Sequence, residues 1–298
     1  MRISTQSLFE SGALRLGELQ TSLVKTQQQI GSGRRILSPS DDPIAAARAL
    51  DVTQAQSLNT QYGRNRQYAT DTLTTVEGTL SSVTSLLQDV RDIVIASGNG
   101  LLTDNERAFQ ATALASRFDE LLGLANSRDA FGNYVFSGFQ TDTPAFVKTP
   151  TGATYQGDSG QQLLQVEATR QMAVSNSGQS VFQGGGQDIF QTITGLVTLL
   201  QTPGTPAPGA LTTSLGNVDL ALNNVLTVRA SVGSRLQELD SLNNFGEDRG
   251  LQYSQILSEL QDLDYTEALT RLSQQQFTLE AAQRSFSTIS KLSLFNFI

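Results

Sequence analysis

The chain has 298 residues, a formal net charge of −8, and no cysteine, histidine or tryptophan. The missing cysteines and histidines exclude disulfide bonds, thiol or imidazole catalysis, and zinc sites of the ordinary type. The acidic balance without basic clusters argues against nucleic acid or an anionic membrane as a partner, and no apolar run approaches the ~20 residues that span a bilayer.

Both ends of the chain carry narrow apolar stripes at helical spacing. The first lies at Phe9, Ala13, Leu16, Leu19, Leu23 and Ile30. The second lies at Ile256, Leu260, Leu263, Leu272, Leu279, Phe286, Ile289 and Leu292. Chain ends are usually polar and fray, and helices with stripes this narrow are not stable alone. We therefore expect the stripes to bury each other, or to bury themselves against neighbouring subunits as an assembly interface.

The segment 31–43, GSGRRILSPSDDP, is expected to connect two helices. Gly31 and Gly33 should end the first helix, and Pro39 should keep the connector extended. Asp42 is the predicted N-cap of the next helix. Pro43 then occupies the first helical position, where its missing N–H costs nothing.

The charged residues of this connector suggest no catalytic or metal site. We interpret Asp41 and Asp42 as capping residues rather than a metal or acid–base pair, because no further carboxylate lies nearby in the sequence. Arg34 and Arg35 are expected to be solvated or intersubunit charges, since two arginines do not make a nucleic-acid patch.

Long helices are predicted before the middle of the chain. Residues 44–97 contain apolar positions mostly three and four apart, which predicts one helix about 80 Å long. The segment SGNG at 97–100 should break it. Thr103 and Glu106 then form a capping-box pattern, which predicts a second helix ending near residue 128.

Helices return in the last third of the chain. The periodicity predicts helices at about 188–200 and 211–242, separated by an exposed proline-rich loop at 202–209. The segment 243–246 is a candidate break or register shift before the terminal helix. Gly233 is interpreted either as a tolerated surface glycine, costing roughly 1 kcal/mol against alanine, or as a point of close helix approach. The sequence slightly favours the surface glycine.

Between these helical regions the chain predicts a small β insertion. Gly, Thr, Ser and Gln are frequent from residue 129 to 186, and Gly184–Gly186 is the expected exit hinge. Short apolar or alternating runs predict strands at 133–136, 145–147, 163–166 and 171–174.

The predicted fold is mainly α with a small β insertion (α+β). The N- and C-terminal segments should form a long antiparallel helical bundle or coiled coil, with an outer β domain in the middle.

No catalytic constellation is apparent. The glycine-rich segments 97–100 and 184–186 are not followed by the Lys-Ser/Thr pair of a phosphate-binding loop. No histidine exists to activate a serine or threonine as a nucleophile. We expect no enzymatic activity, cofactor or metal.

Several segments resemble the bacterial flagellin superfamily. They are MRISTQ at 1–6, QQIGSGRRILSPSDDPIAAARAL at 28–50, DAFGNYVFSGFQTDTPAF at 129–146, VRASVGSRLQEL at 228–239 and SFSTISKLSLFNFI at 285–298. Within the superfamily, DDPIAA and the ending SLFNFI resemble the branch that joins hook to filament. Filament flagellin would show an SSGLRIN-like connector followed by DDAAG.

The resemblance implies three domains: residues 1–43 with 246–298 as a terminal coiled-coil domain, 44–129 with 187–245 as a helical bundle, and 130–186 as the outer β domain. It implies terminal helices that are disordered in the monomer and fold on polymerisation. It also implies extracellular location in the flagellum after export without a cleaved signal, and the first residues indeed lack the apolar core of a signal peptide. The implied partners are copies of the chain in a ring, a hook-side junction protein, filament flagellin, and a cytoplasmic export chaperone at about 251–298.

The function implied is a structural junction that links hook to filament. The rival function within the family is that of filament flagellin itself. In another functional class, an enzyme such as a flagellin with a metalloprotease insertion is excluded by the lack of histidine. A cytoplasmic coiled-coil scaffold unrelated to motility would share the helical pattern, and detection of the chain in sheared flagella would exclude it.

Overall fold

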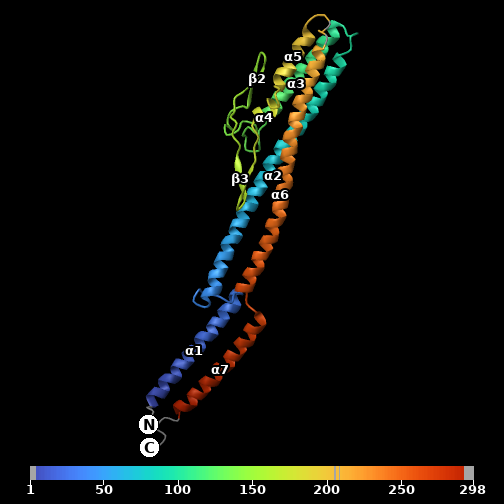
Figure 1. Ribbon diagram of the computed structural model, residues 1–298. Coiled ribbons are helices and arrows are strands. Elements are labelled where there is room, and N and C mark those ends of the chain that lie inside the picture. Colours follow the sequence, from blue (N-terminus) through green and yellow to red (C-terminus); the bar gives the residue numbers. More distant parts are fainter. Residues whose placement is uncertain (1–4, 205, 208, 292–298) are drawn as a thin grey trace, which may run out of the picture. The chain divides into compact units, whose positions relative to one another are not determined.

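The computed structural model describes residues 5–204, 206–207 and 209–291 (Figure 1). Its helices are α1 (Thr5–Ser32), α2 (Pro43–Ser97), α3 (Asp104–Ala125), α4 (Gly178–Phe182), α5 (Ile189–Gln201), α6 (Ala210–Gln261) and α7 (Tyr265–Lys291). Its strands are β1 (Phe146–Thr149), β2 (Gly152–Tyr155), β3 (Leu163–Glu167) and β4 (Arg170–Ala173). The predicted fold class, mainly α with a small β insertion, is confirmed.

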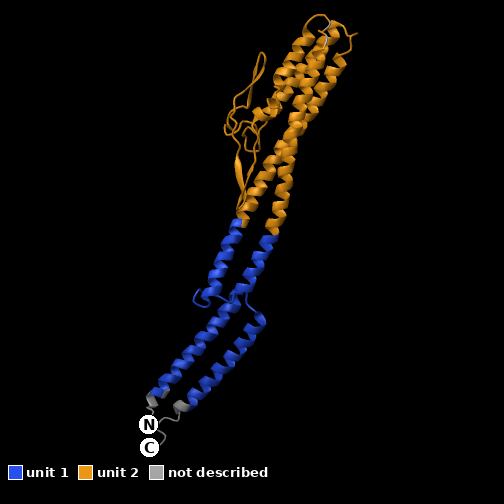
Figure 2. Ribbon diagram, viewed as in Figure 1, with its two compact units in different colours: residues 1–58, 248–298 blue, residues 59–247 orange. Residues whose placement is uncertain are grey.

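The chain divides into two compact units, shown in different colours in Figure 2. Unit 1 comprises residues 1–58 and 248–298, and unit 2 comprises residues 59–247. Helices α2 and α6 therefore contribute residues to both units. The three-domain division predicted from the sequence stays a prediction.

The apolar core lies in unit 2. Along α2, apolar side chains at steps of three and four are completely buried: Leu73, Val76, Leu80, Val83, Leu87 and Val90. They belong to one cluster with buried residues of α3, α5 and α6. Burial of each such side chain stabilises the fold by about 1.5–3 kcal/mol. The long helix predicted for residues 44–97 is confirmed within one residue of its start.

Helix α3 begins as its capping-box pattern predicts. The Thr103 N–H donates to Glu106 Oε2 at 2.7 Å, and the Glu106 N–H donates to Thr103 Oγ1 at 3.3 Å. The helix ends at Ala125, three residues earlier than expected. The next residue, Asn126, uses its side-chain amide to bond both the N–H and the C=O of Phe146, which ties the helix end to β1.

The β insertion consists of two separate antiparallel hairpins, β1–β2 and β3–β4. The strand predicted at 133–136 is wrong. Asp129 accepts the N–H groups of Phe131 and Asn133, which turns the chain just before this segment, and within it Tyr134 forms only an isolated β-bridge with Arg128. The sequence patterns also miss strand β2 and the short helix α4. A buried aromatic cluster lies beside these elements, with neighbouring ring centroids 4.8–5.9 Å apart. It consists of Phe136, Phe146, Phe182 and Phe190.

Helix α6 continues through residues 243–246, so the break considered there is wrong. Buried Arg66 of α2 holds this part of the helix, because its Nε donates to Asn243 Oδ1 at 2.7 Å while its Nη1 donates to Val166 O at 3.1 Å. Gly246 leaves room for this guanidinium, which a Cβ at that position would strike. At Gly233 an added Cβ meets nothing within 4 Å, which agrees with the surface-glycine interpretation.

Helix α5 follows its N-cap Asp188, close to the predicted start, and the described residues of the proline-rich segment after it (202–204, 206–207 and 209) are not helical. At the predicted exit hinge, Gly185 and Gly186 both adopt positive φ angles, of 65° and 79°.

Among the described residues, no helix is long and apolar enough to cross a membrane.

Candidate assembly interface

In unit 1, α1 and α7 pack side by side as an antiparallel two-helix coiled coil (Figure 1). The residues of α7 that are not exposed recur in alternating steps of four and three: Ala268, Leu272, Gln275, Leu279, Ala282 and Phe286. On α1 the matching positions are Phe9, Gly12, Leu16, Leu19, Leu23, Thr26 and Ile30. This spacing is the heptad repeat of a coiled-coil seam.

The seam is only partly apolar and mostly half-buried. Thr26 and Ala268 are buried, whereas the leucines of the seam are half-buried. Gln275 occupies a seam position and donates to Ser22 Oγ at 2.7 Å. A polar residue in a seam fixes the register of two helices at a cost in stability. A hairpin of this kind buries little apolar surface on its own.

Aromatic packing joins the helices near the far end of the described hairpin. The rings of Phe9 and Phe286 lie 4.7 Å apart between centroids. Gly12 makes this approach possible, because a Cβ there would lie 2.8 Å from the Phe286 ring.

The structure places most of the sequence-predicted stripe in unit 1. Phe9, Leu16, Leu19, Leu23 and Ile30 lie on the seam of α1, and Leu272, Leu279 and Phe286 on that of α7. Half-buried Ile256 and Leu260 belong to the last turns of α6, and Leu263 follows that helix. The side chain of Ile289 and the whole of Leu292 lie outside the described residues. That these residues form an interface between copies stays a prediction.

The connector 33–42 meets the α6–α7 connector through backbone hydrogen bonds. The Leu263 N–H donates to Gly33 O at 3.0 Å, and the Arg35 N–H donates to Gln261 O at 2.7 Å. Gly33 has φ +68°, a left-handed conformation suited to glycine after the end of α1. Buried Gln29 donates to Arg35 O at 2.6 Å. We call this meeting point, residues 29–42 with 259–268, the joint.

Each helix end at the joint has its own cap. Gly33 follows α1, and Asp42 accepts the Ala45 N–H at 3.0 Å at the start of α2, as predicted. Arg35, whose side chain is 47% exposed, donates to Leu260 O at 2.9 Å in the last turn of α6, a contact that the sequence did not predict. Its expected role as a solvated or intersubunit charge stays a prediction. Asp264 accepts the N–H groups of Thr266 and Glu267 at the start of α7.

Asp41 fixes the turn between Ile36 and Pro43. Its carboxylate accepts from Lys25 Nζ at 2.7 Å and from the Leu37 and Ser38 N–H groups at 3.0 and 3.1 Å. These bonds, the one from Lys25 first, lower the pKa of Asp41 to about 2. The pKa of Asp42 is also lowered, chiefly by the Ala45 N–H. Exposed Pro39 lies in the same turn, and Gly31 lies in the last turn of α1.

The hairpin also exposes large apolar side chains away from its seam. Four of them are about half exposed or more: Leu14 (70%), Val24 (48%), Leu269 (51%) and Phe277 (74%). None belongs to the stripe predicted from the sequence. Leu14 and Phe277 lie on the side of their helix opposite the seam. They can be recognised as outer-face residues only once the face that forms the seam is known.

Carboxylates are numerous at the joint, but they do not form a metal site. Within the described part of the chain, no three Asp or Glu residues are placed to hold a metal ion. Asp41, Asp42 and Asp264 are instead occupied in capping backbone N–H groups.

Two family models match the chain. Residues 3–141 match the bacterial flagellin N-terminal helical region, and residues 215–298 match the bacterial flagellin C-terminal helical region. The two matched segments contain α1, α2 and α3 and most of α6 with α7, which are the helices that build the joint and the coiled coil.

Relatives are similar to the chain over its whole length. Flagellar hook-associated protein 3 of Escherichia coli (strain K12) is 33% identical, covering 99% of both chains. A flagellin of Listeria monocytogenes is 21% identical over 98% of this chain and 95% of its own. A putative flagellar hook-associated protein of Vibrio parahaemolyticus is 29% identical. Its structure superposes with a TM-score of 0.68, over 74% of this chain and 100% of its own. The chain therefore belongs to the bacterial flagellin family, and within it to the flagellar hook-associated protein 3 group.

Proposed function

We propose that this chain is a structural component of the bacterial flagellum that links hook to filament by self-assembly. One observation carries the proposal: the α1–α7 hairpin has a half-buried seam and exposes further large apolar side chains outside it. A surface of this kind gains stability when neighbouring copies cover it.

Membership of the flagellar hook-associated protein 3 group supports a proposal about the chain's partners. We propose that copies form a ring, that one side of the ring meets a hook-side junction protein, and that the other side meets filament flagellin. An export chaperone would bind the C-terminal region, about 251–298, before the chain leaves the cell without a cleaved signal. The exposed apolar residues of α7 support a shielding partner before assembly.

We infer that the chain has no catalytic role. A sequence without histidine or cysteine lacks the side chains that most often act as base or nucleophile near neutral pH. The titratable groups of the joint act as helix caps and ion pairs.

A strain that lacks this chain tests the function. A hook–filament junction protein predicts cells with hooks but without filaments, and flagellin lost to the medium. A plasmid copy should restore the filaments. If the chain were filament flagellin, the medium would contain no other flagellin, and purified chain would extend into long polymers by itself. Filaments on the hooks of the deletion strain would contradict both functions.

A further inference from the structure

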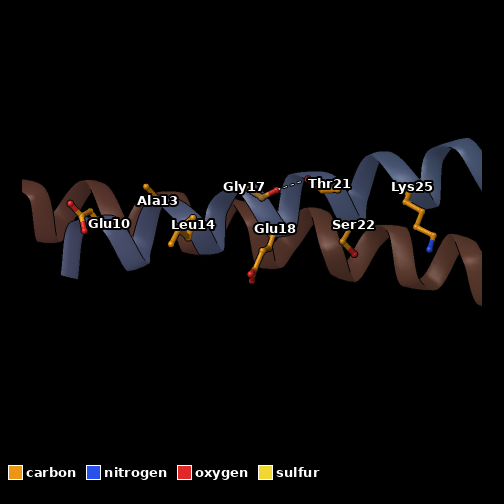
Figure 3. A pocket seen from close by; sticks show the side chains of 8 residues that line it. All are labelled: Glu10, Ala13, Leu14, Gly17, Glu18, Thr21, Ser22 and Lys25. Atoms are coloured by element: carbon orange, nitrogen blue, oxygen red, sulfur yellow. Dashed lines mark hydrogen bonds between the residues drawn. The ribbon is translucent and has the colours of Figure 1, made fainter. Parts of the chain in front are cut away.

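A hollow lies on the outer face of α1, at the glycine that interrupts that face. Figure 3 shows its lining side chains, all from α1: Glu10, Ala13, Leu14, Gly17, Glu18, Thr21, Ser22 and Lys25. Gly17 also lines a second hollow, shared with Leu37 and Ser38 of the connector. An added Cβ at Gly17 meets nothing within 4 Å, so the space is empty in the single chain.

Helix α7 presents a large aromatic side chain on its own outer face. Phe277 is 74% exposed and lies opposite the seam. Arg284 follows seven residues later, on the same outer face, and is also exposed. The outer face of α7 therefore carries an apolar knob and a positive charge about two helical turns apart.

We propose that Phe277 of one copy inserts into the hollow at Gly17 of the next copy. The proposal rests on the proposed function, because it requires copies that assemble side by side. In a ring all copies point the same way, so α7 of one copy runs antiparallel to α1 of its neighbour. When Phe277 lies opposite Gly17, Arg284 lies opposite Glu10, because each is seven residues away along its own helix.

This contact uses a face that the single chain leaves uncovered. The seam leucines of α1 and α7 already contact each other, whereas Leu14 and Phe277 are exposed. The contact joins two different surfaces, so it repeats from copy to copy around a closed ring. The Glu10–Arg284 pair would set which registers are allowed, since opposite charges favour one register and like charges disfavour others.

Filling the hollow tests the contact. Gly17→Leu should preserve the helicity of the purified chain, because the site has room, and should greatly reduce the number of hooks that carry filaments. Gly216→Leu, at an exposed helical glycine of unit 2 with equal room, is the matched control and should restore filaments normally. Normal filaments with Gly17→Leu would overturn the proposed contact but leave the proposed function intact, because the deletion strain tests that separately.

Charge reversal tests the register. Glu10→Arg alone and Arg284→Glu alone should each reduce the number of filament-bearing hooks, whereas the double variant should recover much of the loss. Equal losses in the double and single variants would contradict the pairing of these two residues.

An independent observation concerns the turn between α2 and α3. Asn99 and Gly100 are the only Asn–Gly pair in the sequence, and both are exposed. The Leu101 N–H donates to the Asn99 side-chain Oδ1 at 3.1 Å, and the Leu102 N–H donates to the Asn99 backbone oxygen at 3.1 Å. Within the described residues, no hydrogen bond of this turn uses the Gly100 N–H.

We infer that Asn99 is a site of spontaneous deamidation in the folded chain. The deprotonated Gly100 nitrogen attacks Asn99 Cγ, the bond from Cγ to Nδ2 breaks, and ammonia leaves, so that a cyclic succinimide forms. The Leu101 N–H stabilises the negative charge that develops on Oδ1. Water then opens the ring to aspartate or isoaspartate. The net reaction consumes one water and releases one ammonia, without oxidation or reduction.

Two other asparagines, each followed by serine, provide internal comparisons. Asn126 has its side-chain amide bonded to both backbone groups of Phe146. Asn176 is buried, and its Oδ1 accepts from Arg235 Nη1 at 3.2 Å. The fold holds both side chains away from the geometry of ring closure, so they should not react in the folded chain.

Peptide mapping by mass spectrometry after incubation at mildly alkaline pH tests this inference. In the folded chain Asn99 should deamidate at a rate close to that in urea, whereas Asn126 and Asn176 should react only in urea. Gly100→Ala should slow the reaction at least several-fold. Alanine fits at this position of the turn, because Gly100 does not have a positive φ and a Cβ added there meets nothing within 4 Å. An unmodified Asn99 in folded chain that deamidates in urea would overturn the inference.

Discussion

At the residue scale, two glycines near the end of α1 have opposite requirements. Gly31 is helical with open space at its Cβ, whereas Gly33 has φ +68° and would place a Cβ 3.0 Å from Tyr265 Oη. Gly31→Ala should therefore stabilise the hairpin by up to about 1 kcal/mol. Gly33→Ala should destabilise it by about 1–2 kcal/mol, the cost of a left-handed non-glycine residue.

Hydrogen exchange of amides in α1 and α7 measures both effects, because it reports the free energy of local opening. The two variants serve as controls for each other, since each adds the same methyl group, two residues apart, at sites that differ in backbone conformation and in the space at Cβ. Equal effects of the same sign would show that the joint does not hold Gly33 in this conformation.

Asp41 makes the joint sensitive to acid. Its folded pKa is about 2, below the ordinary value of about 4. For a lowered carboxyl pKa, the stabilisation is complete above the unfolded value and is lost as the pH falls through the folded value. The contribution of Asp41 should therefore disappear between about pH 4 and pH 2.

An NMR titration of the Asp41 carboxyl carbon measures this pKa directly. Lys25→Met should raise the midpoint toward the ordinary value, because Lys25 makes the largest contribution to the lowered pKa. A midpoint near 4 in the unaltered chain would contradict the contacts described for Asp41.

At the element scale, the seam and the outer face of α7 should respond differently to truncation. Leu279 is half-buried against α1, so Leu279→Ala should destabilise the hairpin by about 1–2 kcal/mol. Phe277→Ala should leave the stability of the single hairpin nearly unchanged, because Phe277 is mostly exposed. Amide hydrogen exchange in α7 distinguishes the two variants. A larger loss of stability for Phe277→Ala than for Leu279→Ala would show that the seam does not lie on the face of α7 that contains Leu279.

The helices could be predicted from the sequence more fully than the β insertion. The capping residues of α2, α3 and α5 and their apolar spacing are local signals, and the structure confirms all three starts within a residue or two. The segment 133–136 has the apolar character of a strand, but it follows directly on the turn at Asp129 and forms only an isolated bridge between Tyr134 and Arg128. In the sequence, Gly246 suggests a helix break. The structure shows instead that the missing side chain leaves room for the Arg66 guanidinium.

The candidate interface was predictable in part. The stripe identified which helices associate, because a heptad seam is a local pattern. The outer face was not predictable, since Phe277 and Leu14 become significant only when their exposure in the folded hairpin is known. The role of Arg35 was also hidden, because it caps a helix that ends 225 residues later in the chain.

At the scale of the whole molecule, the two units differ in how their apolar residues are used. Unit 2 has a continuous buried core, whereas the described part of unit 1 has a narrow seam and few buried apolar side chains. A folded unit 2 with a terminal hairpin that would gain burial from neighbouring copies is suited to a structural junction, as we propose.

The role of the terminal hairpin is tested most directly by a chain that lacks residues 281–298, expressed in the deletion strain. Electron microscopy counts the hooks that carry filaments, and assay of the medium verifies that the shortened chain is exported. We predict that the exported, shortened chain leaves hooks without filaments, because Phe286 and the end of the hairpin are lost. Hooks with normal filaments would contradict the claim that the terminal hairpin assembles the junction.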